Sequence, residues 1–151
     1  MRKICYRNRQ PMNGMEMIPD RSIAVAGAGS IGCFVGGMWA VAGRKVALLA
    51  RPRVIRAIED GGLRLTSFEG LACRIAPDRL TLSEDPSIFE QAGMVVVTVK
   101  SADTAGIADI IAAHAPMDAV IVSLQNGVGN ADMLRERLPG AACSRAWCRS
   151  T

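Results

Sequence analysis

The chain has 151 residues, half of them hydrophobic, which suits one domain with a sizeable core. Its net charge of +4 comes from the two ends, because residues 21–138 carry 12 basic and 12 acidic residues. The sequence therefore shows no basic stripe of the kind that binds nucleic acid. No apolar run reaches the roughly 18 residues that a membrane span requires. The five cysteines form no CxxC pair and the single histidine builds no cluster, so neither a disulfide framework nor a metal site is expected, and a reducing, cytoplasmic setting fits this composition.

The first twenty residues are predicted to be a disordered extension. They carry four basic side chains but no apolar segment of the kind that a secretory signal requires. An organelle transit peptide stays open as an alternative, although the segment contains no serine. The folded domain is therefore expected to span residues 21–140.

Short apolar runs alternate with amphipathic segments along this domain. In chain order we expect a strand at 22–26, a helix at 30–42, a strand at 45–49, a helix at 54–60, a hairpin of 63–66 and 72–75, a short helix at 86–91, a strand at 94–99, a helix at 103–114, a strand at 119–124 and a helix at 130–138. The first helix has apolar residues at helical spacing, namely Ile31, Phe34, Val35, Met38 and Val41. Asn130 is a plausible N-cap of the last helix. Strands separated by helices predict an α/β fold with a doubly wound parallel sheet.

A glycine-rich turn follows the first strand and opens the first helix. It reads Gly27-Ala28-Gly29-Ser30-Ile31-Gly32, the GxGxxG spacing of Rossmann-type dinucleotide-binding domains. Gly27 permits the tight turn, Gly29 lets the backbone touch a pyrophosphate, and Gly32 lets the helix press against the strand. Free N–H groups near Ser30 and Ile31 would receive the phosphate charge at the positive end of the helix. A turn used only for packing is the alternative, but the position between strand and helix favours dinucleotide binding.

The end of the second strand indicates which dinucleotide binds. NAD-binding domains usually place Asp or Glu there to accept hydrogen bonds from the ribose hydroxyls. This chain has no carboxylate at that point and instead carries Arg51 and Arg53. A guanidinium group attracts a 2′-phosphate in a bidentate fork, whereas a carboxylate repels it. We therefore predict NADP(H) rather than NAD, with Arg51 as its ligand because it lies closer to the strand; an ordinary charged loop is the alternative.

Four segments in a fixed order carry a family resemblance. They are the glycine turn, Leu49-Ala50-Arg51, Val97-Thr98-Val99-Lys100 and Leu124-Gln125-Asn126-Gly127-Val128-Gly129-Asn130. Together they resemble the N-terminal domain of the ketopantoate reductase (2-dehydropantoate 2-reductase) family, over roughly residues 22–140. The resemblance implies that Lys100 and Asn126 contact the cofactor near its reacting end, where they could also touch the substrate. A surface lysine and a turn asparagine are the alternatives from the residues alone.

The resemblance also implies a reaction. Family members transfer a hydride from NADPH to the keto carbon of a small 2-oxo acid, converting 2-dehydropantoate to pantoate in pantothenate biosynthesis. A lysine and other polar residues of an all-helical second domain supply the proton and hold the substrate, so the catalytic residues of this chain stay unknown. Residues 141–151 show no periodicity. We therefore expect an irregular tail there and interpret the chain as a truncated cofactor-binding half that lacks the helical domain.

Two other functions stay open at this stage. One is an NAD(P)-dependent dehydrogenase acting on another 2-oxo acid or a 3-hydroxy acid. The other is a nucleotide-sensing module without chemistry, which would need the glycine turn and Arg51 but not Lys100 and Asn126. The sequence does not indicate an oligomeric state.

Overall fold

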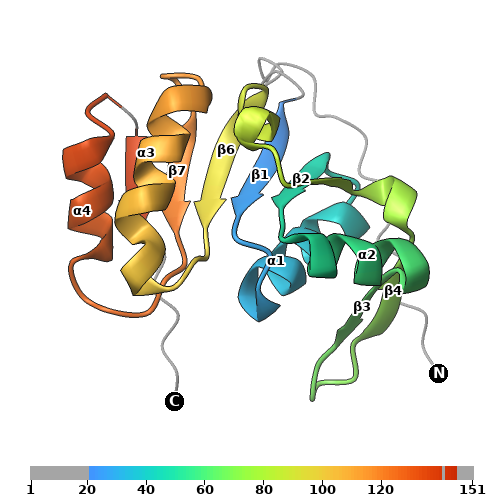
Figure 1. The fold of residues 1–151 in the computed structure, drawn as a ribbon. Helices are drawn as coiled ribbons and strands as arrows, with labels where there is room; N and C mark the ends of the chain where they lie inside the picture. The colour runs from blue at the N-terminus through green and yellow to red at the C-terminus, as the bar shows by residue number, and fades with distance from the viewer. Residues whose placement is uncertain (1–20, 141, 146–151) are drawn as a thin grey trace, which may run out of the picture.

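The computed structural model describes residues 21–140 and 142–145 and contains a six-stranded parallel sheet with a separate hairpin (Figure 1). The strands are β1 (Ser22–Ala26), β2 (Val46–Leu49), β3 (Leu63–Thr66), β4 (Ala72–Ile75), β5 (Thr81–Ser83), β6 (Ala92–Val97), β7 (Val120–Ser123) and β8 (Ala142–Arg145). The helices are α1 (Ser30–Val41), α2 (Pro52–Gly61), α3 (Thr104–His114) and α4 (Asn130–Arg137), with short 3-10 turns η1 (Pro77–Arg79), η2 (Pro86–Phe89) and η3 (Ser101–Asp103). The strand order β5-β2-β1-β6-β7-β8 confirms the predicted doubly wound, Rossmann-type sheet.

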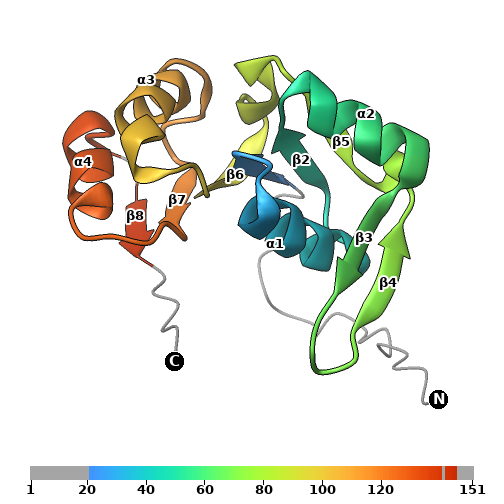
Figure 2. The ribbon, with the colours of Figure 1, turned by 60° about the horizontal axis from the view of Figure 1, so that its bottom comes forward.

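The sheet separates two apolar cores because successive side chains of a strand point to opposite faces. Ala24 and Ala26 of β1 pack in a core that includes residues of η2, α3 and α4. Val25, between them, packs in a second core with residues of α1, α2 and the β3–β4 hairpin. Figure 2 shows α3 and α4 together at one end of the sheet, and α1 beside the hairpin at the other.

Helix α1 is confirmed near its predicted bounds, and it packs against the sheet through its small residues. Ile31 and Val41 are 56% and 48% exposed, whereas the buried residues of α1 are Gly32, Gly36, Gly37 and Ala40. A Cβ on Gly36 would lie 2.8 Å from Leu48 Cδ2. The helix therefore lies too close to its neighbours for larger side chains, and the apolar periodicity does not identify its buried face.

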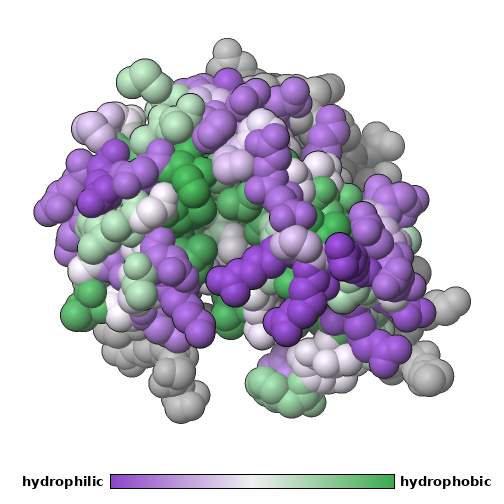
Figure 3. Space-filling view, in the orientation of Figure 1, coloured by the Kyte–Doolittle hydropathy of each residue, from purple (hydrophilic) through white to green (hydrophobic). Residues whose placement is uncertain are grey.

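The hairpin of β3 and β4 is confirmed at its predicted bounds, and α2 begins two residues before the predicted start, at Pro52. On the outer surface, hydrophilic side chains gather over α2 (Figure 3), whose Arg53, Arg56 and Glu59 are exposed while Ile58 is buried. Pro52 occupies the first turn, where the missing N–H costs no helical hydrogen bond.

Both edge strands of the sheet differ from the sequence predictions. The sequence predicted no strand at β5, which has only three residues and pairs in parallel with β2. The irregular segment predicted at 141–151 is wrong for Ala142–Arg145, because β8 pairs there in parallel with β7. The predicted extension at 1–20 and the remainder of the predicted tail lie outside the described residues.

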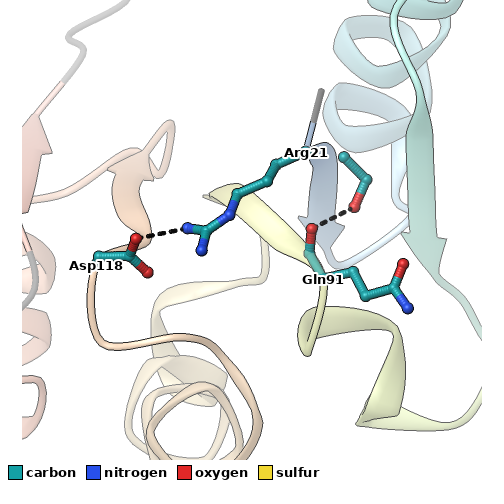
Figure 4. Close-up of polar contacts among 4 residues, drawn as sticks. Arg21, Gln91 and Asp118 are labelled. Atoms are coloured by element: carbon teal, nitrogen blue, oxygen red, sulfur yellow. Dashed lines mark hydrogen bonds and ion pairs between the residues drawn. The ribbon is translucent and has the colours of Figure 1, made fainter. Parts of the chain in front are cut away.

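The start of β1 is fastened to two other parts of the chain (Figure 4). Arg21 donates to the Asp118 carboxylate at 2.7 Å, and the Ser22 hydroxyl donates to the Gln91 carbonyl at 3.2 Å. The register between β1 and β6 shifts here, so that Gly93 has no partner across the ladder. A Cβ on Gly93 would lie 2.8 Å from Arg21 Cβ, so glycine leaves the space that Arg21 fills.

Within the described part of the chain, no helix combines the length and the apolar character that a membrane crossing would need.

Candidate functional site

The structure brings all the predicted site residues to the carboxyl edge of the parallel sheet. The glycine turn follows β1 and Arg51 follows β2, while Lys100 and Asn126 come after β6 and β7. These four strands are consecutive in the sheet and run in the same direction, so their ends lie along one edge. Ligands of doubly wound sheets bind outside this edge.

The turn after β1 has the backbone geometry that only glycine adopts readily. Gly27 has a φ of +108°, and a Cβ there would lie 2.8 Å from Val99 Cγ1. The Thr98 hydroxyl donates to the Gly27 carbonyl at 2.6 Å, which ties the turn to the end of β6. A Cβ on Gly32 would collide with the same carbonyl, whereas a Cβ on Gly29 would meet nothing within 4 Å. The fold therefore requires glycine at positions 27 and 32, whereas Gly29 leaves open space at the start of the helix.

The amino end of α1 is open to an anion. Gly29 is the N-cap and provides no side-chain bond, and the first turn contains no acidic residue. Gly29, Ser30 and Ile31 are exposed. The first N–H groups of a helix have no partner within it and carry the positive end of the helix dipole. This end of α1 therefore has both the donors and the charge that a phosphate requires.

One thiol lies under the turn. Cys33 Sγ donates to the Ala28 carbonyl at 3.5 Å, and burial raises the pKa of the Cys33 thiol. The neutral thiol therefore supports the turn and places no negative charge beside the helix end.

Arg51 is exposed at the N-cap of α2, directly after the end of β2. Residues 46–58 contain no Asp or Glu. The edge is not free of carboxylates, however, because the Ala50 N–H donates to the Ser83 carbonyl at 2.9 Å and so brings Glu84 and Asp85 next to the end of β2. Asp85 accepts a bond from the Ser87 N–H at 2.9 Å, and bonds to Ser87 lower the pKa of the Asp85 carboxyl. The sequence did not reveal these neighbours because β5 was not anticipated.

Lys100 and Asn126 are both exposed, and the loops that carry them are joined. The Ser101 hydroxyl donates to the Asn126 carbonyl at 3.1 Å. Neither the Lys100 ammonium nor the Asn126 amide bonds to another side chain within 21–140, so both are available to a ligand.

Asn130 is not the cap of α4, which corrects the sequence prediction. Gly129 is the N-cap, with a φ of +88°, and the side chain of Asn130 is buried and donates to Ser101 and to the Asn126 carbonyl. Gln125 is also engaged internally, since its amide bonds to Val99 and Thr104. Sequence reasoning missed both roles, because Val99, Ser101 and Thr104 lie more than twenty positions away from the amides that they bond.

A hollow of about 440 Å³ lies at the opposite edge of the sheet, where the amino ends of β1, β2 and β5 meet. Ser22, Lys45, Thr81 and Gln91 are among the residues that line it. It lies across the sheet from the glycine turn and takes no part in the site. Among the described residues, no group of three or more His, Cys, Asp or Glu side chains is placed to hold a metal ion.

The family model described as ketopantoate reductase PanE/ApbA matches residues 23–151. A 2-dehydropantoate 2-reductase of Halobacterium salinarum is 36% identical over 118 residues, which are 78% of this chain and 38% of that protein. A 2-dehydropantoate 2-reductase of Archaeoglobus fulgidus is 34% identical over 113 residues, which are 74% of this chain and 34% of that protein.

Solved structures show the same similarity. A PanE/ApbA family ketopantoate reductase from Ralstonia eutropha aligns with a TM-score of 0.71 and 39% identity, over 83% of this chain and 40% of that protein. The chain therefore spans two fifths or less of the length of each of these three relatives.

Proposed function

This chain belongs to the ketopantoate reductase PanE/ApbA family, and we propose that it binds NADP(H) at the carboxyl edge of its sheet. The observation that carries the proposal is the unobstructed amino end of α1 beside Arg51, with Gly29 leaving room for a phosphate. In this arrangement the N–H groups near Ser30 and Ile31 hold the pyrophosphate, and Arg51 holds the 2′-phosphate.

We further propose that this cofactor site serves the reduction of a small 2-oxo acid, as in the 2-dehydropantoate 2-reductases that the chain resembles. When bound, NADPH would supply a hydride to the keto carbon, and a proton added to the keto oxygen would complete the alcohol. Lys100 can donate to a ribose oxygen or to the substrate carboxylate, and the Asn126 amide can donate and accept at once. Another 2-oxo acid is the alternative substrate within the same chemistry. The cysteine pattern supports a cytoplasmic location for this reaction.

Calorimetric titration of the folded chain with NADPH and with NADH tests the cofactor proposal. We expect NADPH to bind more tightly than NADH, and Arg51→Glu to remove most of that preference by weakening NADPH binding about 10–100-fold. Arg56→Glu is the matched control, because it makes the same charge change on an exposed position of the same helix. Absence of heat with both nucleotides would overturn the proposal. If Arg51→Glu and Arg56→Glu weakened NADPH binding equally, Arg51 would not be the ligand of the 2′-phosphate.

A further inference from the structure

Every buried polar side chain in the described part of the chain lies at one place, beneath the loops that carry Lys100 and Asn126. These side chains belong to Thr104, Ser123 and Asn130, which are 0%, 3% and 6% exposed. Burying a polar group is unfavourable unless it is hydrogen-bonded, and none of the buried side-chain nitrogens and oxygens described lacks a partner. A satisfied polar cluster under an otherwise apolar sheet fixes geometry in a way that apolar packing does not.

The half-buried amide of Gln125 forms the first part of this cluster. Gln125 Oε1 accepts from the Ser123 hydroxyl at 3.1 Å. Gln125 Nε2 donates to the Val99 carbonyl at 3.0 Å and to Thr104 Oγ1 at 2.7 Å. Gln125, the second residue after β7, therefore holds Val99, the residue immediately before Lys100.

The amide of Asn130 forms the second part. Thr104 Oγ1 donates to Asn130 Oδ1 at 3.4 Å, so the two parts are joined through Thr104. Asn130 Nδ2 donates to Ser101 Oγ at 2.9 Å and to the Asn126 carbonyl at 3.0 Å. Asn130 therefore holds the residue immediately after Lys100 and the backbone of Asn126 with one amide group.

Gly127 makes room for this arrangement. It has a φ of +115°, and a Cβ there would lie 3.3 Å from Asn130 Nδ2 and 3.4 Å from Ser101 Oγ. The loop can thus lie directly over the Asn130 amide without a side chain between them. Lys100 and Asn126 are exposed in this assembly, and their side chains are left free while the bonds above hold the neighbours of Lys100 and the carbonyl of Asn126.

We propose that Asn130, assisted by Ser101, is a positioning residue that fixes Lys100 and Asn126 relative to each other at the nicotinamide end of the site. The inference rests on the proposed function, because it assumes that a nicotinamide dinucleotide occupies this edge. Asn130 does not touch the ligand; it acts through the two loops. Loss of its donors leaves the glycine turn and Arg51 intact, since these belong to β1, α1 and the end of β2.

The test compares a whole cofactor with its adenine end. NADPH and 2′,5′-ADP, which lacks the nicotinamide, are titrated into the wild-type chain, Asn130→Asp and Ser101→Ala. Asn130→Asp keeps the shape but removes both N–H donors, and Ser101→Ala removes one exposed hydroxyl with less risk to folding. We expect each variant to weaken NADPH binding about 3–10-fold and to leave binding of 2′,5′-ADP unchanged. The change in nicotinamide fluorescence on binding should decrease in parallel.

Gln91→Glu is the matched control, an amide-to-acid change at an exposed position on the opposite edge. It should leave the binding of both ligands unchanged. If the wild type binds neither ligand, the proposed function fails and the inference fails with it. If the wild type binds both and the variants retain full NADPH affinity and fluorescence, or lose both ligands equally, the inference alone is overturned. If Asn130→Asp does not fold, the NADPH and 2′,5′-ADP affinities of Ser101→Ala decide whether the inference holds.

Discussion

Three glycines within six residues meet different surroundings in the turn after β1. Gly27 is required by its positive φ, Gly32 by the backbone carbonyl that a Cβ would strike, and Gly29 by neither. The φ of Gly29 is −80°, which any residue adopts. Because neither backbone conformation nor packing requires a glycine at position 29, we attribute this glycine to the space that a ligand needs.

This difference predicts that alanine at position 29 affects mainly cofactor binding, whereas alanine at position 32 affects mainly stability. Gly29→Ala should lower the free energy of unfolding by no more than about 1 kcal/mol, the cost of a poorer N-cap, yet weaken NADPH binding at least about tenfold, because the methyl group occupies the approach of the phosphate. Gly32→Ala should cost about 3 kcal/mol of stability through overpacking. Urea unfolding and calorimetry measure both quantities. Equal losses of stability would contradict this account of the turn.

At the scale of elements, the sequence was informative wherever a segment carries its own pattern. The apolar run of β6 and the turn residues between β3 and β4 are local signals, and both elements were predicted. β5 and β8 are short edge strands without apolar alternation, and they are defined by pairing with β2 and β7. The carboxyl edge could be predicted because it follows from strand direction. The bond from Asn130 to Ser101 could not be predicted, because the two residues lie 29 positions apart.

Two helical glycines predict opposite effects of alanine. A Cβ on Gly37 of α1 would lie 2.9 Å from both Ile75 Cδ1 and Leu65 Cδ1, whereas one on Gly106 of α3 would meet nothing within 4 Å. Alanine favours a helix over glycine by about 1 kcal/mol, so Gly106→Ala should stabilise the chain by up to that amount. At Gly37, overpacking of about 1–3 kcal/mol should cancel or exceed the gain. Thermal unfolding distinguishes them, and stabilisation by Gly37→Ala would show that the hairpin moves freely from α1.

At the scale of the whole molecule, the ion pair of Arg21 and Asp118 joins residues 97 positions apart, and Asp85 fastens η2 beside the end of β5. The hydrogen bond from Arg21 lowers the pKa of the Asp118 carboxyl, and bonds to Ser87 lower that of Asp85. Both carboxylates are exposed to solvent, so each contributes modestly.

These shifts predict the direction of acid sensitivity. A carboxyl whose folded pKa lies below its unfolded value stabilises the fold above the unfolded value, about pH 4, and loses that contribution as the pH falls through the folded value. The urea midpoint should therefore decrease below about pH 4, and less steeply in Asp118→Asn and Asp85→Asn. Glu69→Gln, at an exposed position in the hairpin turn, is the control. A slope unchanged in both Asp variants would rule out these two groups as its source.

The pairing of the central strands has a consequence for the synthesis of the chain on the ribosome. Ala24 of β1 pairs with Val95 of β6, a partner that the ribosome adds about 70 residues later. Protein synthesis adds about 5–20 residues per second, so roughly 4–14 seconds pass between the synthesis of β1 and that of β6. During this interval the apolar β1 segment lacks its β6 neighbour, so it can associate with other chains.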